Sequence, residues 1–142
     1  MKFFMSAEYD GRYDDFDKSL RESQNSIEKI IKDLIENRSY GGAVKNFSVI
    51  PIVIKFDPKM EKEGWFEDRV LFKKKSGEAD IRLRVDYERF VKGDDEIKKK
   101  LLIENVIRSI RELGKKIKDG FDVVSFEADI LRAFGYRYED LK

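Results

Sequence analysis

The sequence contains no histidine and no cysteine. Histidine is the commonest general base and the commonest metal ligand, so its absence removes most routes to acid–base and zinc chemistry. The absence of cysteine excludes disulfides and thiol nucleophiles. Catalysis of the Cys–His or Ser–His–Asp type is therefore impossible, and only carboxylates remain to hold zinc. These absences favour a protein that is not an enzyme and that has no metal or other cofactor.

Long apolar runs are also missing. No run approaches the roughly 18 residues of a membrane span, and the N-terminus turns acidic too early for a signal peptide. Charged residues are abundant but balanced, with 30 Lys and Arg against 29 Asp and Glu. That balance disfavours a general affinity for nucleic acid or for membranes. We expect a cytoplasmic protein, with residues 1–142 forming a single domain and no membrane partner.

The spacing of apolar residues predicts both strands and helices. Alternation is typical of strands, and steps of three and four residues are typical of amphipathic helices. Asp94 or Asp95 is expected to cap one helix and Asp122 another. The predicted strands are 2–9, 46–58, 65–75 and 78–90, and the predicted helices are 15–37, 95–118 and 122–134.

The predicted elements follow the order β-α-β-β-β-α-α. Short turns between the later strands favour an antiparallel meander of about four strands. The helices are expected to cover one face of this sheet, which makes the predicted fold α+β. The apolar run at 46–58 predicts a strand that is buried on both faces. Pro51 interrupts that run and has no N–H, so a bulge or an exposed donor side is expected there.

The stretch "EADIRLRVDYERF", residues 78–90, sorts its side chains by parity. In a strand, one parity points to the core and the other points away from it. The interleaved arginines keep the carboxylates ionised, so an ion network or a recognition surface is favoured over acid–base catalysis. The residues expected inward are Ile81, Leu83, Val85 and Tyr87; those expected outward are Asp80, Arg82, Arg84, Asp86 and Glu88.

The segment "EYDGRYDDFD", residues 8–17, is acidic and rich in aromatic residues. Five carboxylates against Arg12 give it a local net charge of −4. Its spacing matches no calcium loop, so it is either a solvated turn with charges at a helix N-terminus or a protein-binding patch. The candidate partner-binding residues are Tyr9, Asp10, Tyr13, Asp14, Asp15 and Asp17, followed by Arg82, Arg84 and Asp86 on the charged strand face.

The whole chain resembles a known family. The stretches "KFFMS", "VIPIVI", "IRLRVDYERF" and "LLIENVIRSIRELGKKIKDGFD" carry the likeness. It is similar to the immunity protein 44 family, one of the immunity families of bacterial polymorphic-toxin systems, whose toxins are secreted or delivered by contact. The resemblance implies a non-enzymatic inhibitor that binds a cognate toxin domain in the cytoplasm. Many such toxins are nucleases, which implies an inhibitor with exposed acidic and aromatic groups.

Two other functions are compatible with the residues. A small nucleic-acid-binding or regulatory module could use Lys73–Lys75 together with Lys115, Lys116 and Lys118. A carboxylate-only enzyme could hold a metal at Asp14 or Asp15. The family resemblance favours the toxin inhibitor over both.

Overall fold

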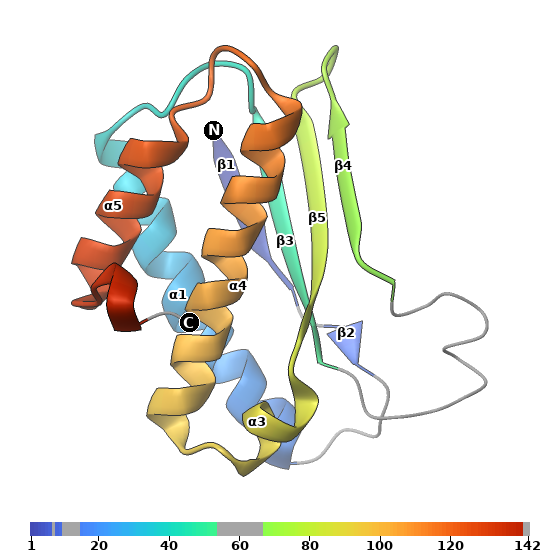
Figure 1. The fold of residues 1–142 in the computed structure, drawn as a ribbon, viewed down its shortest axis with the longest axis vertical. Helices are drawn as coiled ribbons and strands as arrows, with labels where there is room; N and C mark the ends of the chain where they lie inside the picture. Colours follow the sequence, from blue (N-terminus) through green and yellow to red (C-terminus); the bar gives the residue numbers. More distant parts are fainter. Residues whose placement is uncertain (7, 10–14, 54–66, 141–142) are drawn as a thin grey trace.

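The computed structural model describes residues 1–6, 8–9, 15–53 and 67–140, with the backbone alone for residues 8–9 and 15–17. A twisted sheet is covered on one face by three long helices, as Figure 1 shows. The fold is α+β, as the periodicity predicts. The strands are β1 (Lys2–Met5), β2 (Glu8–Tyr9), β3 (Asn46–Val53), β4 (Arg69–Lys73) and β5 (Glu78–Val85). The helices are α1 (Asp15–Asn37), α3 (Tyr87–Lys92), α4 (Asp95–Lys116), α5 (Val123–Phe134) and a 3₁₀ turn at Tyr138–Asp140.

The sheet is mostly parallel, so the predicted antiparallel meander is wrong. Its order is β1-β3-β5-β4, and β2 also pairs with β3. Strands β1, β2 and β5 run parallel to β3, and only β4 is antiparallel to its neighbour β5. Two physical features explain the difference. Helix α1 returns the chain to the starting end of the sheet, and β5 lies between β3 and β4.

Strand β3 lies at the centre of the sheet and is almost fully apolar. Phe47 and Val49 face the helices, and Ile52 on the opposite face is also buried. On its outer side, β1 pairs with β3 as far as Val49, and β2 pairs from Ile52 onward. Pro51 falls between these two pairings, where its missing N–H leaves no gap in either ladder. The disruption expected at Pro51 is therefore found in the pairing beside it, since β1 pairs before Pro51 and β2 pairs after it.

Strand β5 ends earlier than its alternation predicts. Ile81, Leu83 and Val85 are buried against the helices, which confirms the inward parity. Asp86 then caps α3, because its Oδ1 accepts a hydrogen bond from the Arg89 N–H at 3.2 Å. Tyr87 is therefore the first residue of a helix and is only half-buried. The predicted strand 78–90 is correct up to residue 85 and wrong beyond it.

Helix α4 packs along the sheet and is positioned by a buried amide. Asn105 is 1% exposed, and its Nδ2 donates to the Leu83 carbonyl of β5 at 2.8 Å. Asp94 caps the N-terminus of α4 through the Ile97 N–H at 2.9 Å, and Asp122 caps α5 in the same way through Ser125. Both predicted caps are confirmed. The helix ends with Lys116, before the predicted end at residue 118.

The α1–β3 loop and the α4–α5 loop are joined by their backbones at one end of the molecule. The Asp122 N–H donates to the Tyr40 carbonyl at 2.7 Å, and the Ala43 N–H donates to the Gly120 carbonyl at 3.3 Å. Gly41 lies between these bonds with φ of +112°. A Cβ on Gly41 would overlap the Gly120 carbonyl oxygen, so only glycine allows this approach.

We expect Gly41→Ala to lower the free energy of unfolding by about 3 kcal/mol, since the positive φ alone costs ~1–3 kcal/mol and the overlap adds to it. The melting temperature should fall by about 10 °C. Gly42→Ala is the matched control, because nothing lies within 4 Å of a Cβ added there. Thermal and urea unfolding followed by circular dichroism measure both variants. Equal stability of the two would show that the loops do not depend on this contact.

Candidate functional site

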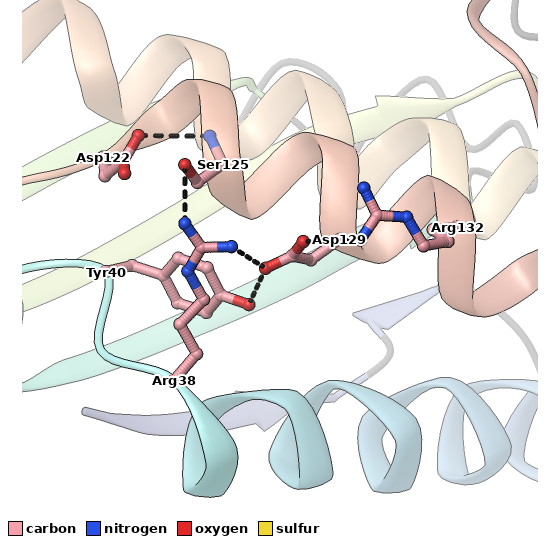
Figure 2. Close-up of polar contacts among 6 residues, drawn as sticks. All are labelled: Arg38, Tyr40, Asp122, Ser125, Asp129 and Arg132. Atoms are coloured by element: carbon pink, nitrogen blue, oxygen red, sulfur yellow. Dashed lines mark hydrogen bonds and ion pairs between the residues drawn. The ribbon is translucent and has the colours of Figure 1, made fainter.

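A polar cluster drawn from distant segments joins the α1–β3 loop to α5 (Figure 2). One oxygen of Asp129 accepts hydrogen bonds from the Tyr40 hydroxyl at 2.7 Å and from Arg38 Nη1 at 3.2 Å. Arg38 also donates to the Ser125 hydroxyl at 3.1 Å. The Tyr40 ring stacks on Phe126 with 4.3 Å between centroids and 7° between planes. The cluster therefore combines an ion pair, a charge-assisted hydrogen bond and an aromatic stack.

The chemistry of this cluster suits a structural clamp between the α1–β3 loop and α5, and not a catalytic site. Burial, together with the bond to the Asp129 carboxylate, raises the pKa of Tyr40 well above its ordinary value. A phenol that keeps its proton so firmly is a poor general base or nucleophile. Hydrogen bonds from Ser125 lower the pKa of Asp122, which fixes that side chain as an ionised helix cap. We assign the cluster to holding the loop and α5 together.

The raised pKa of Tyr40 predicts a loss of stability in alkali. The unfolded phenol ionises near pH 10 while the folded one stays neutral, so the free energy of unfolding falls as pH rises above about 10. Tyr40→Phe should lower stability at neutral pH by about 1–2 kcal/mol, through loss of the bond to a charged acceptor.

The alkaline decline should also be shallower in Tyr40→Phe than in the parent, with a remainder due to Tyr136, whose pKa burial also raises. Urea unfolding at pH 7 and at several values from pH 9.5 to about 11 measures how the free energy of unfolding declines with pH in each variant. Tyr138→Phe is the control, because Tyr138 is 50% exposed. Identical alkaline slopes for the parent and for Tyr40→Phe would rule out Tyr40 as the cause.

Four of the sequence-predicted partner-binding residues, Tyr9, Asp15, Asp17 and Asp86, lie at the other end of the molecule. In the sheet register, Tyr9 of β2 pairs with Val53, and Val53 pairs on its other side with Val85. Tyr9 and Asp86 thus belong to neighbouring ends of parallel strands. Figure 1 shows β2, α3 and the first turns of α1 at this end. We call it the carboxyl-end surface, formed by β2, the start of α1 and residues 86–97.

The acidic segment is only partly placed by the structure. Asp15 and Asp17 lie in the first turns of α1, where carboxylates favour the positive end of the helix dipole. Asp10, Tyr13 and Asp14 lie outside the described residues. The backbone positions of Tyr9, Asp15 and Asp17 therefore place the two described ends of this segment at the carboxyl-end surface.

The charged residues of β5 lie on the sheet face turned away from α1, α4 and α5. Their parity is opposite to that of the buried Ile81, and the side chains of Arg82 and Arg84 are half-buried. Around Arg84, the backbone N–H donates to Asp68 Oδ1 at 2.8 Å, and its carbonyl accepts from Arg108 at 3.1 Å. The three long helices do not cover this strand face, yet Asp80 Oδ1 and Arg82 Nε on it are buried. Asp86 is exposed, and it serves the fold as a cap.

The carboxyl-end surface also carries apolar residues that sequence reasoning missed. Val91 is 41% exposed and Ile97 is 42% exposed, at the corner between α3 and α4. The periodicity of α4 places Ile97 in the buried stripe, four residues before Leu101. It lies instead beside Gly93, at the start of the helix. Val91 directly follows the predicted strand 78–90 and belongs to no predicted element.

The corner itself is acidic. Between residues 86 and 96, five carboxylates face two cations, giving a local net charge of −3, and all seven charged side chains are exposed. The next three residues of α4 after Ile97 are lysines, but these are half-buried, and two of them lie against aromatic rings. The carboxyl-end surface therefore joins two acidic segments that are far apart in the sequence. The acidic side chains of the corner are Asp86, Glu88, Asp94, Asp95 and Glu96.

A family model of immunity protein 44 matches residues 1–136 of the chain. The chain belongs to the immunity protein 44 family. No curated protein and no solved structure matches it. As a family member it is an immunity protein, and the partner of an immunity protein is a toxin. The family model spans every strand, both ends of the sheet and all three long helices.

Families of immunity proteins are generally non-enzymatic. Within the residues that the structure describes, no three His, Cys, Asp or Glu side chains are grouped to bind a metal ion. Nor does any helix in that part of the chain combine the length and apolar character that crossing a membrane requires. The carboxyl-end surface, with its acidic rim and exposed aliphatic residues, is the immunity protein's best candidate site for a protein partner.

Proposed function

We propose that this immunity protein neutralises a cognate toxin domain in the cytoplasm by binding it, without a catalytic step, and that the toxin is a nuclease. The observation that carries the proposal is the match to immunity protein 44 over residues 1–136. The composition supports the absence of a catalytic step, because a chain without histidine and cysteine has neither an imidazole base nor a thiol nucleophile. Inhibition is then a matter of surface complementarity.

The charge of the carboxyl-end surface supports a nuclease as the toxin. A nuclease must attract phosphates, so its active-site cleft is cationic. The acidic segment at residues 8–17 and the acidic corner at residues 86–96 have local net charges of −4 and −3. Complementary charge of this kind accelerates encounter and orients the partners more than it adds affinity. We assign the acidic rim to steering the toxin domain onto this end of the molecule.

Affinity requires apolar anchors inside the charged rim. Aromatic and aliphatic residues that become fully buried contribute most of the binding energy in typical interfaces. Val91 and Ile97 supply exposed aliphatic groups at the α3–α4 corner, and Tyr9 lies in the strand at the same end of the sheet. We therefore propose Val91, Ile97 and Tyr9 as the central contacts. Arg82 and Arg84 on β5, and Asp86 directly after it, extend the proposed surface.

Co-expression with the toxin domain encoded by the adjacent gene tests the proposal. We expect growth to be rescued and the two proteins to elute together at a one-to-one ratio in size-exclusion chromatography. A catalytically dead toxin variant should bind equally well, since the inhibitor acts by binding. Persistent toxicity together with separate elution of the two folded proteins would contradict the proposal.

The division between steering and anchoring predicts different kinetic effects. Asp15→Asn/Asp17→Asn should lower the association rate constant about three- to tenfold at low salt and converge with the parent at high salt. Val91→Ser/Ile97→Ser should instead raise the dissociation rate constant at least about tenfold. Biolayer interferometry with immobilised toxin domain measures both.

The matched control for these variants is Asp33→Asn/Glu36→Gln, which removes two exposed carboxylates from the far end of α1. It should leave both rate constants within about twofold of the parent. Circular dichroism checks that α1 survives loss of its N-terminal charges, which are worth about 0.3–1 kcal/mol each. An equal slowing of association by the control would mean that total charge, and not the carboxyl-end surface, steers the encounter.

A further inference from the structure

Two lysine runs that are distant in the sequence meet at the end of the molecule opposite the carboxyl-end surface. Lys74 and Lys75 occupy the β4–β5 turn, Lys116 ends α4 and Lys118 follows it, and Lys45 precedes β3. Together they line a pocket of about 570 Å³. All five side chains are exposed. Figure 1 shows the three contributing segments side by side at its upper end. We call this the lysine pocket.

Backbone hydrogen bonds hold the walls of the lysine pocket in place. The Gly77 carbonyl in the β4–β5 turn accepts from the Lys45 N–H at 2.8 Å and from the Asn46 N–H at 3.1 Å. The Ala43 N–H donates to the Gly120 carbonyl, which ties the same loop to the segment after α4. The lysines therefore project from a fixed frame, and little backbone entropy is lost when a ligand binds.

The charge of the lysine pocket is not balanced by its surroundings. Asp119 is the one acidic residue among those that line it, so five cations and one anion give a net charge of +4. Other lysines of the protein do pair, as Lys32 does with Glu28 at 2.8 Å. In the part of the chain that the structure describes, no carboxylate lies within ion-pair distance of the five pocket lysines.

Helix-dipole complementarity explains only part of this charge. A lysine in the last turn of α4, such as Lys116, is stabilised by the negative end of the helix dipole. Lys45, Lys74 and Lys75 come from a loop and a turn, where no helix end requires a cation. Clustering like charges costs stability through repulsion. A bound anion relieves that cost, and the pocket shape gives it a place to sit.

We propose that the lysine pocket binds the phosphate groups of a nucleotide or a single-stranded nucleic acid. Lysine ammonium groups are effective phosphate ligands as point charges. Phe72 and Ile117 add an apolar wall, and a basic groove with an aromatic side chain is a common way to hold an unpaired strand. A protein partner typically covers roughly 800 Å² of the surface of the protein that it binds. The unpaired lysine charges here occupy only one pocket, which is a smaller site. That confinement favours a compact phosphate ligand over an acidic protein segment.

Fluorescence anisotropy of a labelled single-stranded RNA of about 12 nucleotides tests this site in the absence of any toxin. With four phosphates neutralised, log K against log[salt] should have a slope of about −3, so affinity should fall about 50-fold between 50 and 200 mM salt. Lys74→Gln/Lys116→Gln should weaken binding about tenfold at low salt and reduce the slope by about 1.4. Lys18→Gln/Lys29→Gln removes the same charge from exposed positions on α1 and should behave like the parent.

The outcomes separate the ligand sources and the rival explanations. Displacement of the RNA by ATP shows a nucleotide site, and displacement only by unlabelled RNA shows a strand site; both support the proposal. Three results overturn it: no anisotropy change at 50 mM salt, equal losses in the pocket and α1 variants, or a polyglutamate peptide that competes more strongly than RNA. Relief of repulsion in the pocket variant opposes the loss of the Lys116 interaction with the α4 dipole, so its melting temperature should stay within a few degrees of the parent, and circular dichroism checks that it is folded.

Discussion

The parallel pairing of β3 with both of its neighbours is the constraint from which the rest of the structure follows. Parallel neighbours cannot be joined by tight turns, so α1 must carry the chain back between β1 and β3. Strands of this kind are buried on both faces, which accounts for the apolar character of β3 on both parities. The pairing also gathers the ends of β2, β3 and β5 at a single edge. The carboxyl-end surface exists because the strands point the same way.

Helix α4 connects the acidic end of the molecule to the basic end. It begins at the acidic corner with Asp95 and Glu96, and its last turn carries Lys115 and the pocket residue Lys116. Both sets of charges suit the dipole of the helix, which is positive at its start and negative at its end. Over 22 residues the helix spans roughly 33 Å. The net charge of +1 therefore conceals two oppositely charged ends, and an argument from total charge misses both of them.

The sequence contained signals for the parallel sheet that the prediction did not weigh. A helix between two strands is the ordinary connection for parallel pairing, and a strand that is apolar on both parities is typical of a parallel sheet. The prediction gave more weight to the short turns between the later strands than to these two signals. Of those turns, the β4–β5 hairpin does join antiparallel strands. Beyond Val85, the residues Tyr87, Phe90 and Val91 fit a helical spacing as well as they fit part of the alternation. Asp86 as a cap decides between them, and its side-chain bond is visible only in the structure.

Helix bounds and caps could be predicted because they depend on local residues. Asp94 and Asp122 act within three residues of their own positions, and the apolar stripe of α1 gives its limits directly. The lysine pocket and the carboxyl-end surface depend instead on which distant segments lie next to each other in the fold. Lys45 and Lys118 become neighbours through backbone bonds made by Gly77 and Gly120. No periodicity encodes such a meeting, so both sites required the fold.

The separation of the two charged ends bears on how they act. Their distance along α4 is several times the screening length of roughly 8 Å at physiological salt. A ligand in the lysine pocket therefore exerts almost no direct electrostatic force on a partner approaching the carboxyl-end surface. Coupling between the ends would need two discrete arrangements of the elements that connect them. The Asn105 amide, which fixes α4 on β5, and the Arg38–Tyr40–Asp129 clamp, which fixes α5 on the α1–β3 loop, oppose such a rearrangement. The geometry thus favours two independent sites on one rigid support, so the proposed toxin site and the proposed phosphate site would not exclude each other.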